Sequence, residues 1–218
     1  MEKRESYQTI YQGGIGEFVM KKSKFIATVE PAQTEKEAAE IIEEIKKKYW
    51  DARHNCFAYV IGNTNPLMRF SDDGEPSQTA GKPMLDVLLS QELCNVVAVV
   101  TRYFGGTLLG TGGLVKSYQS ATIEGINNSK VITKKPGVCI KLSTDYNHVG
   151  KIQHIIGQDS IPVIDSKFTD IVVMELVLPQ DNLQGFTNKI TDLTRGLATI
   201  EKTKETYFSI IDSKVHLF

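Results

Sequence analysis

Residues 96–116 read VVAVVTRYFGGTLLGTGGLVK, a β-branched run that leads through an arginine and two aromatic residues into a glycine-rich loop. Five glycines fall within the nine residues from Gly105 to Gly113. Glycine reaches positive φ cheaply and lets a backbone approach another group closely. A strand, a glycine loop and a helix in this order present backbone N–H groups and the positive end of a helix dipole, an arrangement that binds anions. The stretch therefore predicts a buried strand and a helix, joined by a loop that serves either anion binding or close packing.

Two nucleotide-binding patterns fail at one residue of this loop. Residues 110–117 read GTGGLVKS and end in Lys-Ser, but the phosphate-binding pattern requires glycine before the lysine, where this chain has Val115. A dinucleotide fingerprint counted from Gly110 fails at the same valine. We therefore expect neither ATP nor NAD, and no cofactor. What remains is an anion site made of free loop amides, with Arg102 before the loop and Lys116 one turn into the helix.

Composition limits the class of protein. The 218 residues carry a net charge of −1, with 41% hydrophobic and 23% charged residues, as is typical of a globular protein. The whole chain has no electrostatic footprint for nucleic acid, so an RNA contact requires a local basic patch. No apolar run approaches the roughly 20 residues that span a bilayer, and the N-terminus lacks the apolar core of a signal peptide. We expect a cytoplasmic protein with no membrane partner.

The three cysteines, Cys56, Cys94 and Cys139, are widely spaced and show no zinc-ligand spacing. The ordinary interpretation is free thiols in a reducing compartment, without a disulfide or a metal. His54 and Cys56 alternate on a predicted strand and so share a face, which by itself is weak grounds for a nucleophile and its base.

An acidic segment precedes the predicted helix that contains Pro83. Asp72, Asp73 and Glu75 surround a glycine, and carboxylate oxygens are ligands for hard cations. The twelve-residue calcium loop pattern is absent, and acidic residues favour a helix N-terminus. We prefer the interpretation as a turn, with Pro83 at the first position of the helix.

Hydrophobic spacing predicts an α+β chain of two domains, residues 1–133 and 134–218, which meet at Lys134-Lys135-Pro136-Gly137. The second domain has the βαββαβ order of a ferredoxin-like fold, with Asp145 and Asp181 as expected helix N-caps. Its expected elements are strand 138–143, helix 145–156, strands 160–168 and 171–178, helix 181–194 and strand 198–211.

In the first domain, residues 6–30 predict two or three strands. Thr34 and Glu37 form a capping box at the start of a helix whose apolar residues follow at helical spacing. The strand 54–61 is apolar on both faces, which indicates a central strand covered on both sides.

Six blocks of the sequence resemble the IMPACT family, in its bacterial branch, and together they cover most of residues 16–128. Two departures stand out. Gln78 stands where the family usually has glycine, and Thr107-Leu108 replaces a more typical aliphatic–lysine pair, which removes a basic residue from the loop. The blocks are KSKF at 22–25, ARHNCFAY at 52–59, RFSDDGEPS at 69–77, TAGKP at 79–83, VVTRYFGG at 99–106 and LGTGGLVKSY at 109–118.

The resemblance implies a first domain with the fold shared by the fourth domain of elongation factor G and the second domain of a small-subunit ribosomal protein. It implies a C-terminal domain like the ferredoxin-like fifth domain of that elongation factor. Eukaryotic relatives carry a different N-terminal module and act in translational control, restraining a stress-responsive initiation-factor kinase by competing for its activator. Only a general link to translation carries over, and the family provides no catalytic residues.

The preferred hypothesis is a non-enzymatic, translation-associated protein that binds RNA or the ribosome through phosphate contacts of the first domain. One alternative is an enzyme that acts on a small anionic or phosphorylated substrate at the glycine loop, with His54 or the acidic segment as acid–base groups. Another is a protein-interaction module. The sequence indicates neither the partner nor the oligomeric state. The candidate anion- or RNA-binding residues are Lys24, Arg53, His54, Arg69, Arg102, Gly105, Gly106, Gly110, Gly112, Gly113 and Lys116.

Overall fold

The computed structural model describes residues 5–218, which form five helices and eleven strands. The chain divides into two compact units, one of residues 7–133 and one that contains Lys134–Phe218. Both mix helices with a sheet, so the α+β class is confirmed. Each unit is described by itself.

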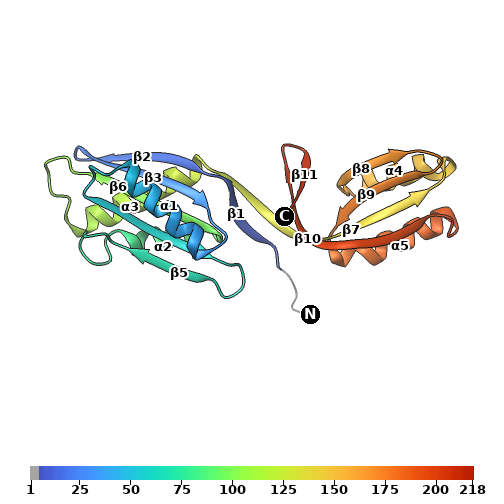
Figure 1. Cartoon of the computed structure of the whole chain (residues 1–218), viewed down its shortest axis with the longest axis horizontal. Coiled ribbons are helices and arrows are strands. Elements are labelled where there is room, and N and C mark those ends of the chain that lie inside the picture. Colours follow the sequence, from blue (N-terminus) through green and yellow to red (C-terminus); the bar gives the residue numbers. More distant parts are fainter. Residues whose placement is uncertain (1–4) are drawn as a thin grey trace. The chain divides into compact units, whose positions relative to one another are not determined.

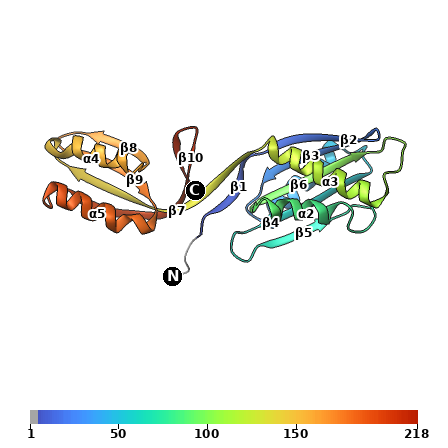
Figure 2. The same ribbon diagram turned by 180° about the vertical axis from the view of Figure 1, so that it is seen from behind.

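The first unit is built on an antiparallel five-stranded sheet with the strand order β2-β3-β6-β4-β5. Helix α1 covers one face of the sheet (Figure 1), and helices α2 and α3 cover the other (Figure 2). The elements are β1 (Tyr7–Gln12), β2 (Gly14–Met20), β3 (Ser23–Pro31), α1 (Glu35–Lys48), β4 (His54–Ile61), β5 (Leu67–Ser71), α2 (Gly81–Ser90), β6 (Val96–Tyr103) and α3 (Gly110–Asn127).

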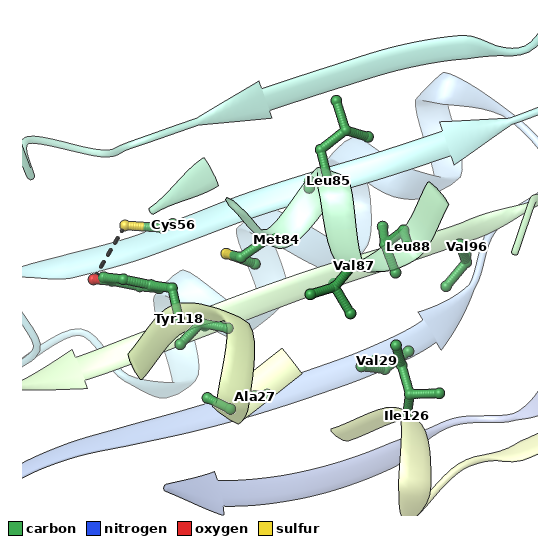
Figure 3. Packing of buried hydrophobic residues seen from close by; sticks show 14 of the residues in the cluster. Ala27, Val29, Cys56, Met84, Leu85, Val87, Leu88, Val96, Tyr118 and Ile126 are labelled. Carbon is green, nitrogen blue, oxygen red and sulfur yellow. Dashed lines mark hydrogen bonds between the residues drawn. The ribbon is translucent and has the colours of Figure 1, made fainter. Parts of the chain in front are cut away.

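Strand β4 has a core on each side, as its sequence predicts. Cys56 and Ala58 face the larger core beneath α2 and α3, which Figure 3 shows around Met84 and Tyr118. Tyr59 points to the other face, into the smaller core beneath α1. Alternate residues of a strand point to opposite faces, so two covered faces require the uninterrupted apolar run.

Helix α3 lies unusually close to strand β2, and glycines make the approach possible. A Cβ atom added at Gly16 would lie 2.3 Å from the backbone carbon of Glu124, and one added at Gly125 would lie 2.8 Å from a methyl group of Val29. Real Cβ atoms essentially never come that close. Because Gly16 and Gly125 have no side chains, α3 can pack directly against the sheet at this position.

The second unit has the βαββαβ element order, and its antiparallel strands lie in the order β11-β10-β7-β9-β8. This is the ferredoxin-like arrangement, with a hairpin added at β11. A core of apolar side chains lies between the sheet and its two helices. The elements are β7 (Lys130–Thr144), α4 (Tyr146–Gln158), β8 (Val163–Phe168), β9 (Val172–Leu178), α5 (Gln180–Thr194), β10 (Thr199–Ile211) and β11 (Lys214–Leu217).

Several local expectations are corrected. Residues 134–137, the expected domain boundary, lie within β7, which starts eight residues before the expected strand at 138. The N-cap of α2 is Ala80, so Pro83 is the third helical residue and not the first. Asp145 caps α4 as expected, with its side chain accepting from the amide of His148, but Pro179 and not Asp181 precedes α5.

Candidate functional site

The register of the first sheet brings most of the predicted residues to one end of the unit. His54 at the start of β4 pairs with Arg102 near the end of β6, and Lys24 at the start of β3 pairs with Tyr103. The glycine loop follows β6 directly, and its Gly105 amide donates to the Ser23 hydroxyl at 3.1 Å. We call this part of the molecule the loop end of the first unit.

Arg102, which we expected to contact phosphate, is instead buried in an internal ion pair. Its Nη1 donates to Oε1 of Glu75 at 2.6 Å, and the two side chains are only 8% and 3% exposed. The hydroxyl of Tyr118 donates to the same carboxylate at 2.8 Å. The guanidinium also lies over the rings of Phe25 and Phe104, at 5.5 and 5.7 Å from their centroids. A phosphate could reach Arg102 only by displacing these groups.

The acidic segment is hydrogen-bonded to the backbone at the start of α2. The carboxylate of Asp72 accepts from the backbone amides of Ala80 and Gly81, at 3.0 and 2.8 Å, and from that of Gln78, at 2.7 Å. It thereby satisfies amides at the start of α2, which has no capping side chain at its N-cap position. Among residues 5–218, no cluster of histidine, cysteine and carboxylate side chains has the geometry of a metal site.

Asp73 and His54 belong to the same turn. One carboxylate oxygen of Asp73 accepts from the amide of Asn55 at 2.7 Å, and its carbonyl lies 2.8 Å from Nδ1 of His54. These bonds anchor the turn to the first residues of β4. Our preferred interpretation of the acidic segment as a turn agrees with this geometry.

The buried thiol of Cys56 is not activated. Its Sγ donates to the carbonyl of Asp72 at 3.0 Å and lies 3.4 Å from the hydroxyl of Tyr118. Burial raises the pKa of the Cys56 thiol and that of the Tyr118 hydroxyl far above their usual values, and the nearby Glu75 carboxylate acts in the same direction. A nucleophilic cysteine needs the opposite shift. Cys56 and His54 are alternate residues of β4, but each is hydrogen-bonded to a backbone carbonyl of the acidic segment, Cys56 to that of Asp72 and His54 to that of Asp73.

The glycines of the loop serve two purposes. A Cβ atom at Gly105 would lie 2.1 Å from the carbonyl carbon of Lys22, so this glycine allows the loop to pack on the β2–β3 turn. Gly113 is also close to a neighbour, with Cβ of Leu109 at 3.0 Å. In contrast, a Cβ at Gly106, Gly110 or Gly112 would meet nothing within 4 Å. Close packing therefore explains only part of the glycine content, and Gly106 and Gly110 serve a second purpose, because they adopt positive φ of 83° and 72°.

Helix α3 begins without a capping side chain. Its N-cap residue, Leu109, provides no hydrogen bond to the first amides, and Gly110 and Gly112 are exposed. The positive end of the helix dipole thus faces open space at the loop end. Lys116 is exposed one helical turn after Gly112 and so lies on the same side of the helix.

Exposed basic side chains surround this loop. Lys21 and Lys22 form the tight β2–β3 turn at positive φ, and Arg53 immediately precedes β4. Lys24 is partly neutralised, because its Nζ lies 2.7 Å from Oε1 of Glu17. Within residues 5–218, Lys21, Lys22, Arg53 and Lys116 have no ion pair.

Arg69 does not belong to this group. It pairs with Tyr59, five positions along β4 from His54, or roughly 17 Å at the usual rise of a strand. Its Nε lies 3.8 Å from Oε1 of Glu35, at the start of α1. Arg69 is therefore at the opposite end of the sheet from the loop.

The end of helix α1 is a part of the site that sequence reasoning missed. Lys46, Lys47 and Lys48 form its last turn, which the helix dipole alone seemed to explain. The hydroxyl of Tyr103 donates to Asp51 at 2.8 Å, which places the end of α1 beside the end of β6. Strand β3, helix α1 and strand β4 follow one another, so the helix must return to the end where β4 starts. This order of elements in the chain was the signal that could have placed the α1 lysines at the loop end.

Exposed apolar side chains occur elsewhere on the first unit. Leu67, Met68 and Phe70 of the edge strand β5 are 36–43% exposed. An unpaired edge strand with apolar side chains is a common contact surface for proteins. Across residues 5–218, no helix is both long and apolar enough to cross a membrane.

Comparison with known proteins explains the sequence blocks. Residues 21–126 match the Impact N-terminal domain, and residues 142–197 match a domain of unknown function (DUF1949). The chain is 40% identical over 202 residues to the "IMPACT family member YvyE" of Bacillus subtilis, covering 93% of each chain. The protein belongs to the IMPACT family. It is also 36% identical to the "IMPACT family member YigZ" of Escherichia coli, covering 81% of this chain and 88% of that one.

Of two further comparisons, one matches about half of this chain and the other nearly all of it. The "Protein IMPACT homolog" of Dictyostelium discoideum is 36% identical over 106 residues, which are 47% of this chain and 30% of that protein. A solved structure described as "Crystal structure of an hypothetical protein" is 32% identical, with a TM-score of 0.59, and covers 93% of this chain and 99% of that one. A solved structure thus matches this chain over the length of both units.

Proposed function

We propose that this IMPACT family protein has a translation-associated role in which the loop end of the first unit binds RNA, free or in the ribosome. The observation that carries the proposal is the group of exposed, unpaired cations, Lys21, Lys22, Arg53 and Lys116, around an uncapped helix N-terminus. Cations and open backbone amides together are the groups that bind phosphate. The resemblance of the first unit to domains of the translation machinery is in keeping with this role.

Binding is favoured over catalysis by the state of the acid–base groups. Glu75 is paired with Arg102, Asp72 accepts from backbone amides, and the Cys56 thiol is buried and hydrogen-bonded. These groups stabilise the fold, which supports binding over the enzyme alternative. His54 is held at Nδ1 by the carbonyl of Asp73.

The test compares two arginines of equal charge and similar exposure. Arg53 lies at the loop end and Arg69 at the opposite end of the sheet. Binding of purified ribosomes and of ribosomal RNA is measured at increasing salt for the native chain, Arg53→Ala and Arg69→Ala. The logarithm of the binding constant falls with the logarithm of salt by about 0.7 to 0.9 per phosphate contact. We expect Arg53→Ala to reduce this slope by about one contact, and Arg69→Ala to leave it unchanged.

Three results would contradict the proposal. The first is no binding to ribosomes or RNA at low salt. The second is an equal loss in both arginine variants, which would show that net charge and not the loop end is responsible. The third is capture of a cellular partner that survives ribonuclease and is lost in Phe70→Asp, which would instead favour a protein partner at β5.

A further inference from the structure

Two large aromatic side chains protrude at the loop end. Trp50, directly after helix α1, is 82% exposed, and Phe104, directly after β6, is 51% exposed. Full burial of a large apolar side chain contributes about 1.5–3 kcal/mol to folding, so neither residue makes its full contribution to stability here. A single exposed apolar residue needs no explanation, but Trp50 closely follows the exposed Lys47 and Lys48, and Phe104 precedes Gly105, which packs on the β2–β3 turn.

One hydrogen bond joins the two chain segments that carry the aromatic residues. Asp51 follows Trp50 and accepts from the hydroxyl of Tyr103, and Phe104 follows Tyr103. That contact lies on the α1 face of the sheet, whereas the Phe104 ring lies beside Arg102 on the α2–α3 face, so the two aromatics flank the end of β6. Their backbones are held by the end of α1 and by the end of β6.

The ring of Phe104 is held so that one face stays open. The Arg102 guanidinium lies 5.7 Å from its centroid, and that guanidinium is itself fixed by Glu75. A cation over the ring favours one orientation of it, and about half of the side-chain surface is open to solvent. The buried ion pair thus supports a flat, exposed aromatic surface.

From this arrangement we infer that the loop end takes single-stranded RNA, with unpaired bases stacked on Trp50 and Phe104. The inference rests on the proposed function and narrows its ligand. In an RNA duplex the base faces are hidden in the stack, and a protein meets mainly phosphates and 2′-hydroxyls. Protruding aromatic rings beside unpaired cations match a strand whose bases are free to stack.

The chain contains one tryptophan, so stacking at Trp50 has its own optical signal. Tryptophan fluorescence and binding constants are measured with an oligouridylate and with a blunt RNA duplex of equal nucleotide length. We expect the oligouridylate to quench Trp50 and to bind more tightly than the duplex. Trp50→Ala weakens oligouridylate binding roughly 5- to 100-fold, the usual loss for one stacked base, and leaves the salt slope unchanged.

Matched controls separate stacking from hydrophobicity and from folding. Phe168 in the second unit is 55% exposed, close to the value for Phe104, so Phe168→Ala controls for Phe104→Ala. Trp50→Phe retains an aromatic face and should retain most of the affinity. Trp50 packs on little else, so its substitution tests binding without disturbing the fold.

The outcomes distinguish this inference from the proposed function. Equal affinity for strand and duplex, with no effect of Trp50→Ala on either, overturns the single-strand inference and leaves RNA binding intact. Absence of binding to any RNA overturns both. Quenching by the oligouridylate together with a loss confined to Trp50→Ala and Phe104→Ala supports the inference.

Discussion

The two units of this chain use charge in opposite ways. The first unit buries an ion pair, Arg102 with Glu75, and leaves its cations exposed around the loop end. The second unit has a main core of apolar side chains and places its charges on the open face of its sheet. There Glu201, Lys141, Glu175 and Asp165 are successive cross-strand neighbours.

This difference bears on the proposal that the first unit is the one that binds RNA. RNA-binding sheets of similar architecture carry aromatic side chains on the open face, on which bases stack. The row across β10, β7, β9 and β8 carries three carboxylates and one ammonium group instead, and Lys167 and Lys204 lie on the same face, so its charges are mixed.

The largest expected effect comes from breaking the buried ion pair. Arg102→Ala leaves the carboxylate of Glu75 buried without its partner, which costs about 3–5 kcal/mol. Urea denaturation followed by amide hydrogen exchange should show this loss in the first unit alone. Lys141→Ala, on the open face of the second unit, should change stability by no more than about 0.5 kcal/mol. Replacing both members of the pair, as Arg102→Met with Glu75→Leu, should recover much of the loss, and a failure to do so would point to a different cause.

A smaller effect separates two aspartates that look alike in the sequence. Asp72→Ala removes the acceptor of three backbone amides at the start of α2 and should destabilise the first unit by about 2 kcal/mol. Asp181, in the first turn of α5, is not the N-cap, so Asp181→Ala should stay within about 0.5 kcal/mol. Thermal unfolding of both variants measures the difference. Equal losses would mean that the amide bonds of Asp72 contribute little.

The smallest effect is a difference in acid sensitivity. The hydrogen bond from His148 lowers the pKa of Asp145 in the second unit, so its contribution to stability is present above about pH 4 and is lost as the pH falls through the lowered pKa. Burial raises the pKa of Glu30 in the first unit, and this carboxyl therefore favours folding more as the pH falls.

Unfolding of each unit between pH 6 and pH 2 tests this contrast. Asp145→Asn keeps a capping side chain and should flatten the acid response of the second unit. Glu30→Gln should remove the opposite response of the first. Profiles that do not change in either variant would assign the acid response to other carboxylates.

Local chemistry made much of the fold predictable. Half of the predicted capping box is present: the Thr34 hydroxyl accepts from the amide of Glu37, but the Glu37 side chain accepts from the amide of Gln33 and not from that of Thr34. The two apolar faces of β4 and the βαββαβ order followed from periodicity alone, because each depends on residues that are neighbours in sequence. The N-cap Asp145 was predicted correctly. Asp181 was not, since Pro179 holds the N-cap position of α5 and Asp181 lies in the first turn of the helix.

The candidate site was less predictable because its contacts are distant in sequence. Arg102 and Glu75 are separated by 27 positions, and nothing local shows that they pair. An arginine before a glycine loop has the same sequence signal whether it faces solvent or a buried carboxylate. The separation of Arg69 from Arg53 likewise depends on strand register, which periodicity does not determine.

The close approach of α3 to β2 extends the reach of a substitution. A side chain at Gly16 would collide with the backbone of α3 at Glu124, and a helix moves as a stiff rod more readily than it bends. The same rod carries Tyr118, whose hydroxyl holds Glu75 beside Arg102. A single methyl group added at Gly16 would thus displace α3 and, through Tyr118, disturb the distant ion pair. The ring of Phe104, which Arg102 contacts, would be disturbed with it.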